Sequence, residues 1–103
     1  MSGARRPGVG CGVAVVRDGR ILLILRKRAP EAGCWALPGG KVDFLEPVET
    51  TIRRETQEEV GIALTGTLEL LGVVDLIEPE AHWVSPIYLA TEFVGEPRLM
   101  EPD

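Results

Sequence analysis

The stretch GGKVDFLEPVETTIRRETQEEVGI, residues 39–62, decides the fold. Its second half is predicted to be a helix, because Pro47 suits a first helical position, acidic residues favour an N-terminal end, and Gly61 suits a C-terminal stop. Since an α-helix advances about 100° per residue, one narrow stripe of it carries Val48, Ile52, Glu55 and Glu59. Apolar and acidic side chains therefore share the face that the helix should bury.

The acidic side chains on this face need a positive partner. Glu58 and Thr51 flank the stripe, and burying a carboxylate costs free energy unless something positive meets it. Arg54 can neutralise one charge, but three clustered carboxylates call for more than one arginine. A hard divalent cation prefers oxygen ligands and would satisfy them directly. The alternative is an ordinary amphipathic helix with a solvated acidic face.

The same stretch resembles the signature of the Nudix hydrolase family. That signature is Gly, five residues, Glu, seven residues, then Arg-Glu-apolar-x-Glu-Glu-x-Gly-apolar. The residues at its fixed positions are Gly40, Glu46, Arg54, Glu55, Glu58, Glu59, Gly61 and Ile62. Thr56 fills the remaining apolar position, and the helical periodicity puts it off the centre of the buried stripe. A match over so long a span is far more specific than a lone glycine motif.

The resemblance implies a metal centre. In that family the signature forms a loop-helix-loop on a mixed sheet and holds Mg²⁺ or Mn²⁺, which bridges the diphosphate of the substrate. By resemblance, Glu55 and Glu59 bind the principal metal, and Glu58 adds a ligand or positions water. The carbonyl of Gly39 completes the shell. Paired glycines at residues 39–40 also let the backbone approach a ligand closely.

The expected reaction is attack of a metal-bound water on phosphorus, with a carboxylate as the general base. Glu58 is the first candidate for that base, and Glu46 and Glu80 are weaker candidates. Arg54 is expected to pair with Glu46 and to fix the orientation of the carboxylates. The predicted products are a nucleoside monophosphate and pyrophosphate. The rival readings are hydrolysis of another diphosphate, such as ADP-ribose or a dinucleoside polyphosphate, and a Nudix-fold binding module without catalysis.

Substrate contacts are predicted from basic and aromatic residues. Composition alone favours a solvated strand end for the basic run Arg26, Lys27 and Arg28. The alternative is that one or more of them reaches substrate phosphate, because the strand leads towards the signature. Gly40 is expected to approach the substrate. The residues that could stack on a base are Phe44, Trp83 and Tyr88, although each could instead pack in the core.

The other candidate residues are given structural roles. Trp35 is expected to pack in the core, and Cys11 to be a small core residue of an apolar strand. Cys34 lies in a loop without a nearby histidine, so a nucleophilic role is not favoured. The single histidine, His82, is expected at the surface end of a strand.

The remaining segments are mostly strands. Residues 9–16 and 21–25 are apolar runs joined by Asp18-Gly19, a strong signal for a two-residue hairpin. Residues 68–77 and 82–94 form two more strands, and Pro86 predicts an edge or a bulge in the second of them. Strands on either side of one strong helix predict a mixed α/β or α+β sandwich.

Composition limits the classes of protein. The chain has 103 residues, of which 45% are hydrophobic and 26% charged, so we expect one globular domain over residues 1–103. The net charge of −5 argues against a nucleic-acid polymer as partner, but not against a nucleotide held through metal ions. No apolar run approaches a membrane span and no leader precedes a cleavage site, which predicts a cytoplasmic protein.

Over residues 5–103 the chain resembles the MutT-like branch, including thiopurine-nucleotide diphosphatases. The matching stretches are RRPGVGCGVAVV, WALPGGKVDF, HWVSPIYLATEF and EPRLMEPD. Leu45 departs from the glycine usual beside the first Glu, which predicts strain in the turn. Similar proteins continue into a Trp-bearing strand and a closing helix, which this chain lacks. We therefore expect an uncovered sheet edge and face, with either a fragment or a homodimer as the explanation.

Overall fold

The computed structural model describes residues 5–25 and 33–98. The strands are β1 (Gly8–Arg17), β2 (Arg20–Ile21), β3 (Ile24–Leu25), β4 (Trp35–Ala36), β5 (Gly39–Lys41), β6 (Ala63–Leu64), β7 (Glu69–Glu78), β8 (Ala81–Ala90) and β9 (Phe93–Val94). The helix α1 (Val48–Val60) lies between β5 and β6 in the chain. The predicted mixed α/β architecture is confirmed.

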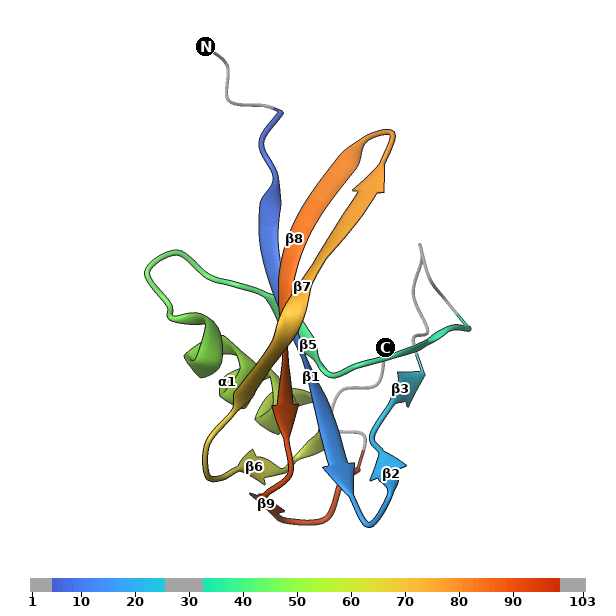
Figure 1. Ribbon diagram of the computed structural model, residues 1–103, viewed down its shortest axis with the longest axis vertical. Helices are drawn as coiled ribbons and strands as arrows, with labels where there is room; N and C mark the ends of the chain where they lie inside the picture. The colour runs from blue at the N-terminus through green and yellow to red at the C-terminus, as the bar shows by residue number, and fades with distance from the viewer. Residues whose placement is uncertain (1–4, 26–32, 99–103) are drawn as a thin grey trace.

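The main sheet is mixed and follows the order β2-β1-β8-β7, with β5 also paired to β1. Strands β1 and β8 run parallel, whereas β1–β2, β1–β5 and β7–β8 are antiparallel. Helix α1 lies beside the lower half of this sheet, and the β7–β8 hairpin extends away from it (Figure 1). Two short pairs, β3–β4 and β6–β9, complete the described strands.

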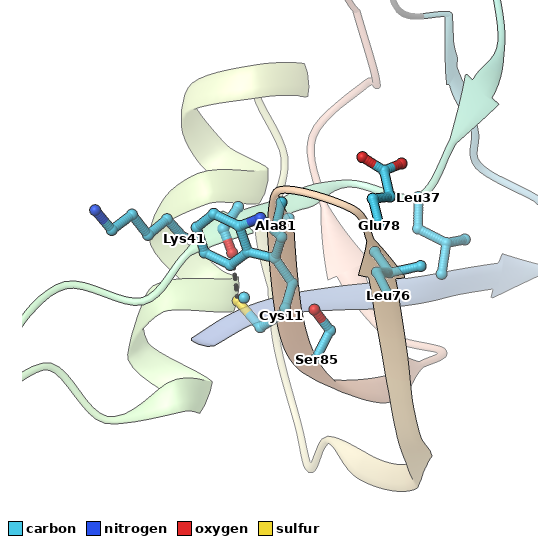
Figure 2. Close-up of a pocket in the computed structure, with 11 residues that line it drawn as sticks. Cys11, Leu37, Lys41, Leu76, Glu78, Ala81 and Ser85 are labelled. Atoms are coloured by element: carbon cyan, nitrogen blue, oxygen red, sulfur yellow. Dashed lines mark hydrogen bonds between the residues drawn. The ribbon is translucent and has the colours of Figure 1, made fainter. Parts of the chain in front are cut away.

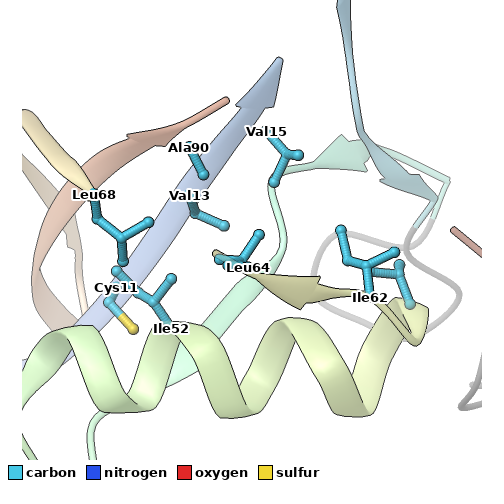
Figure 3. Packing of buried hydrophobic residues seen from close by; sticks show 9 residues of the cluster. Cys11, Val13, Val15, Ile52, Ile62, Leu64, Leu68 and Ala90 are labelled. Carbon is cyan, nitrogen blue, oxygen red and sulfur yellow. The ribbon is translucent and has the colours of Figure 1, made fainter. Parts of the chain in front are cut away.

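The core lies between β1 and α1. Alternate residues of β1 point to opposite faces of the sheet, and Cys11, Val13 and Val15 belong to the buried cluster that includes Ile52 of α1 (Figure 3). The other members of this cluster are Val60, Ile62, Leu64, Leu68 and Ala90. The predicted core role of Cys11 is confirmed, because its side chain is buried there.

The predicted hairpin at Asp18-Gly19 is confirmed. Both residues have positive φ angles, 54° and 75°, as a type I′ turn requires, and Val16 pairs with Ile21 across it. The strand predicted at residues 21–25 is divided in two. Its first part, β2, pairs with β1, whereas its second part, β3, pairs with β4.

Helix α1 begins one residue later than predicted, because Pro47 is its N-cap with an extended ψ of 147°. Gly61 ends it in the left-handed conformation, at φ 76°, as predicted. Thr56, predicted to lie off the centre of the buried stripe, is fully buried. The buried side of the helix is broader than the stripe and also includes Thr51 and Val60.

Two further predictions are corrected. Trp35 does not pack in the core, because 64% of it is exposed on β4, a strand paired only with β3 among the described elements. Pro86 does not lie on an edge, because β8 runs between β1 and β7. The missing N–H of Pro86 is tolerated where the parallel ladder is interrupted, between the pairs Val9↔Val84 and Gly12↔Ile87. A bulge does occur nearby, in β7 between Leu70 and Gly72.

Strand β7 is exposed along almost its whole length. Its exposed large apolar side chains are Leu70, Leu71, Val73, Val74, Leu76 and Ile77. Within the described residues only β8 pairs with it. The predicted uncovered edge is therefore present in this part of the chain. Among the same residues, no helix is both long and apolar enough to cross a membrane.

Candidate functional site

Two carboxylates of α1 meet the two-glycine strand β5. The backbone N–H of Gly39 donates a hydrogen bond of 3.1 Å to Oε1 of Glu59. The carboxylate of Glu55 lies against Gly40 so closely that a Cβ on that glycine would be 2.9 Å from Cδ of Glu55. Both side chains therefore turn towards β5 and away from bulk solvent, as the helical stripe predicted, and Glu55 is only 20% exposed.

Arg54 is the centre of an acidic network beside these carboxylates. Its guanidinium forms a two-pronged ion pair with Glu46, with Nε–Oε2 and Nη2–Oε1 distances of 2.9 Å each. Its Nη1 lies 3.1 Å from Glu55 and 3.2 Å from Glu58, and its Nη2 lies 3.2 Å from Asp43. The predicted pairing of Arg54 with Glu46 is therefore confirmed, and the same arginine holds three further acids.

The network shifts the pKa values of Glu46 and Arg54. The hydrogen bonds from Arg54, and then the one from the Thr51 hydroxyl at 2.7 Å, lower the pKa of Glu46 to about 2. The same contact with Glu46 raises the pKa of Arg54 above its ordinary value. Glu46 is thus an anion at any physiological pH. Because a general base works best with a pKa near the working pH, Glu46 is better suited to holding Arg54 in place than to accepting a proton.

The loop before α1 carries the strain that the sequence predicted. Leu45 has a φ angle of 70°, the left-handed region that favours glycine. The N–H of Glu46 donates to the carbonyl of Asp43 at 3.0 Å, which closes this turn. The turn thereby brings Asp43 and Glu46 to the same guanidinium.

The donor set fits a hard divalent cation. Glu55 and Glu59 supply carboxylate oxygens on one side of α1, and the absence of a Cβ at Gly40 makes the cradle that Glu55 occupies. Across the part of the chain that is described, no three His, Cys, Asp or Glu side chains already converge as a metal shell. Glu55 and Glu58 each direct a carboxylate to Nη1 of Arg54.

A cavity of about 510 Å³ opens beside the glycine strand (Figure 2). One wall is formed by β1 and β5, and the other by the end of the β7–β8 hairpin. The lining residues from the first wall are Gly10, Cys11, Leu37, Gly39, Gly40 and Lys41, and those from the hairpin are Leu76, Glu78, Ala81, Trp83 and Ser85. The cavity therefore shares residues 39–40 with the carboxylate site.

Only some of the residues predicted to contact the substrate line this cavity. Gly40 and Trp83 line it. Tyr88 instead packs against the buried core cluster, and Phe44 is 92% exposed in the loop before α1 and does not line the cavity. Arg26 and Arg28 lie outside the described residues.

Glu80 and His82 lie apart from the Arg54 network. Glu80 is in the β7–β8 turn and forms an exposed salt bridge of 3.9 Å with Arg5. His82 is half-buried, and its Nε2 lies 3.9 Å from Oδ1 of Asp75 on β7, without a hydrogen bond in the described structure. The prediction for His82 is therefore only partly right: it lies at the end of β8, but it is half-buried and not fully at the surface.

Sequence reasoning missed several residues of the site. Asp43 is an acid within the five-residue spacer of the signature, and only its charge could have identified it. Lys41, Glu78 and Ser85 line the cavity but belong to three different strands, so no local pattern joins them. Cys11 lies between the core and the cavity, and its Sγ is 3.5 Å from the carbonyl of Gly40. Burial raises the pKa of its thiol.

One helix packed on a mixed sheet, with acidic side chains turned to a two-glycine strand, defines the class to which the signature pointed. The chain belongs to the NUDIX domain family, which matches residues 4–103. It resembles the structure of a MutT NUDIX hydrolase from Burkholderia pseudomallei, with a TM-score of 0.92 and 65% identity over 96% of this chain and 78% of that one. The MutT-like resemblance is thereby confirmed.

Two relatives of the chain carry different names. The chain is 38% identical to an ADP-ribose pyrophosphatase of Methanocaldococcus jannaschii, over 87% of this chain and 54% of that protein. It is 30% identical to an 8-oxo-dGTP diphosphatase of Proteus vulgaris, over 93% of this chain and 86% of that protein. The chain thus spans about half the length of the first relative and most of the second.

Proposed function

We propose that the protein is a metal-dependent hydrolase of the diphosphate linkage in a nucleoside triphosphate or a related nucleotide. The products would be a nucleoside monophosphate and pyrophosphate. The observation that carries this proposal is the position of Glu55 and Glu59 against residues 39–40, beside an open cavity. Membership of the NUDIX domain family supports it.

The metal would be held by Glu55, Glu59 and the Gly39 carbonyl, with Glu58 as a further ligand. When bound, Mg²⁺ or Mn²⁺ would neutralise diphosphate charge and lower the pKa of a water molecule. Gly39 has a φ angle of 151°, so a side chain there would be strained, and a Cβ would lie 2.1 Å from the carbonyl oxygen of Cys11. Glycine at this position therefore lets β5 lie directly against the backbone of β1.

Glu58 remains the proposed general base. About half of its side chain is exposed, and its carboxylate lies one turn from Arg54 at 3.2 Å. It is therefore the most accessible of the acids that contact Arg54 from α1. Arg54 and Glu46 would act as positioning residues, because their two-pronged ion pair fixes the guanidinium that orients Glu55 and Glu58.

The substrate would enter the cavity with its diphosphate at residues 39–40 and its base towards the β7–β8 hairpin. A relative that is an 8-oxo-dGTP diphosphatase supports a nucleoside triphosphate. A relative that is an ADP-ribose pyrophosphatase supports the second candidate, a nucleoside diphosphate joined to another group. Placement in the cytoplasm and pairing into a homodimer stay predictions.

The test is release of pyrophosphate from a panel of nucleoside triphosphates with and without Mg²⁺. Glu59→Gln and Glu58→Gln should each reduce kcat, whereas Glu49→Gln, an exposed acid on the same helix, should not. Ion chromatography of the products separates the two candidates, since ADP-ribose would yield AMP and ribose 5-phosphate. Unchanged turnover in both Glu58→Gln and Glu59→Gln would remove the proposed mechanism.

A further inference from the structure

A second cavity, of about 560 Å³, opens at the other end of β1, beside the β1–β2 turn. The described residues that line it are all different from those that line the cavity at the glycine strand. In Figure 1 this turn lies at the bottom of the molecule, whereas the β7–β8 hairpin, which lines the first cavity, extends towards the top. The second cavity is therefore a separate feature, and the proposed reaction makes no use of it.

The side chains of β1 and β2 give this cavity an apolar floor and a basic rim. Arg17 pairs with Arg20 across the turn, and two positions further from it the N–H of Leu22 donates to the carbonyl of Val15 at 3.0 Å. Because side chains alternate along a strand, these four side chains share one face of the hairpin. Val15 is buried and Leu22 packs against the core cluster, whereas both arginines are exposed.

The two arginines repel each other. Like charges at directly opposite positions destabilise an antiparallel pair of strands. Asp18, in the turn, also lines the cavity. Among the described residues, however, neither Arg17 nor Arg20 forms an ion pair with Asp18 or with any other acid. An anion between the two guanidinium groups would replace this repulsion with charge-assisted hydrogen bonds.

Arg17 is already held in place for such a contact. Its guanidinium carbon lies 3.5 Å from the centroid of the Phe93 ring, and its Nη2 donates to the carbonyl of Phe93 at 2.7 Å. A guanidinium has five N–H donors, so this one bond leaves donors for a ligand. Because the side chain is fixed before binding, it loses little conformational entropy when an anion arrives.

We propose that this cavity binds a phosphate monoester with an apolar substituent, at a site separate from the carboxylate site. The phosphate would lie between Arg17 and Arg20, since a monoester carries about two negative charges near neutral pH and meets two positive ones. The substituent would lie against Val15, Leu22 and Pro97, which also line the cavity. This inference does not rest on the proposed function, because it uses none of the residues around Arg54.

The first experiment measures binding of phenyl phosphate to the full chain by ¹H–¹⁵N NMR, in buffer with EDTA and no divalent metal. Without a metal ion, the carboxylates around Arg54 outnumber its positive charge and repel a phosphate ester from that site. Saturable shifts are expected at Arg17, Arg20 and Phe93. Benzyl alcohol, which lacks the phosphate, and inorganic phosphate, which lacks the ring, should each bind more weakly.

Three results of this titration would overturn the proposal. The first is the absence of saturable shifts with phenyl phosphate. The second is a set of shifts confined to residues 39–40 and α1, which would place the ligand at the carboxylate site. The third is equal affinity for phenyl phosphate and for either of the two simpler probes, because the site would then not use both the charge and the apolar floor.

The second experiment compares two variants that lose the same charge. Arg20→Gln should weaken the binding of phenyl phosphate by roughly tenfold or more, the usual effect of losing a hydrogen bond to a charged group. Arg6→Gln is the control, because Arg6 is exposed before the start of β1 and does not line the cavity. Equal affinities in the two variants would show that the ligand does not bind between Arg17 and Arg20.

Thermal unfolding separates a lost site from a lost fold. Arg20→Gln should be no less stable than the wild type without ligand, because it removes one of two like charges. Phenyl phosphate should raise the melting temperature of the wild type and of Arg6→Gln, and raise that of Arg20→Gln much less. The same rise in all three proteins would contradict the proposal.

Discussion

At the scale of single residues, Arg54 holds together more of the site than any other described side chain. It contacts four carboxylates. Its two hydrogen bonds to Glu46 form a planar fork. An arginine fork matches a carboxylate in a way that the point charge of a lysine does not. The orientation of the proposed metal-binding acids therefore depends on guanidinium geometry as well as on charge.

We predict that Arg54→Lys reduces kcat/KM by roughly 10- to 100-fold, the usual effect of losing a partner that orients metal ligands. Arg53→Lys is the matched control on the same helix. Arg53 donates to the carbonyls of Leu64 and Gly66, at 2.8 and 2.9 Å, and not to the acids around Arg54. Equal losses of activity in the two variants would contradict the positioning role of Arg54.

The charge of Glu46 gives a second prediction, about pH. Its pKa falls from an ordinary 4.5 to about 2 in the folded protein, so the unfolded chain takes up this proton at a higher pH. The stability that Glu46 contributes is thus complete above pH 4.5 and is lost as the pH falls towards 2. Urea unfolding across this window should show a smaller pH dependence in Glu46→Gln than in the wild type. An identical slope would show that the ion pair does not act on stability.

At the scale of elements, α1 buries two threonines that differ in what they hold. Thr56 donates to the carbonyl of Ile52 within the helix at 2.7 Å. Thr51 donates chiefly to the carboxylate of Glu46, also at 2.7 Å, with a longer contact of 3.4 Å to the carbonyl of Pro47. The helix carbonyl already accepts a backbone bond, whereas the carboxylate loses a partner when Thr51 is changed.

We therefore predict that the same substitution, threonine to valine, has a small effect at position 56 and a larger one at position 51. Thr56→Val should change the free energy of unfolding by less than about 1 kcal/mol, because it removes the donor and the Ile52 carbonyl keeps its backbone partner in the helix. Thr51→Val should destabilise by about 1.5 to 3 kcal/mol, the usual value for a hydrogen bond to a charged group. Urea denaturation measures both. A larger loss for Thr56→Val than for Thr51→Val would contradict this account of the helix.

At the scale of the whole molecule, β7 has an edge that no described strand covers, and exposed apolar side chains on both of its faces. Val73 is 60% exposed and Ile77 is 70% exposed. Because an unpaired apolar edge is a template for another strand, we predict that this chain associates as its concentration rises.

Val73→Lys and Ile77→Lys should each lower the mean mass seen by analytical ultracentrifugation. Thr67→Lys is the control, because it adds the same charge at an exposed position just before β7 without removing apolar surface. A mass that stays monomeric at every concentration in the wild type would refute the prediction.

The sequence predicted most of the carboxylate site and only part of the sheet. Periodicity placed Glu55 and Glu59 on the inward face of a helix, and the capping residues located its ends within one residue. The two-residue turn at Asp18-Gly19 was equally local. Trp35 and Pro86 were misplaced. The exposure of a residue and the order of strands depend on which segments pack against each other, and the hydropathy of a sequence does not show this.

By itself the sequence determined α1, its acidic face and the glycine pair that meets it, because spacing along one helix fixes which side chains lie together. Only the tertiary structure decided that Thr56 is buried, that Arg54 holds Asp43, and that Trp83 lies over Gly8. The physical reason is that the cavity joins β1, β5 and the β7–β8 hairpin, and their register is set by packing between segments that are distant in the chain.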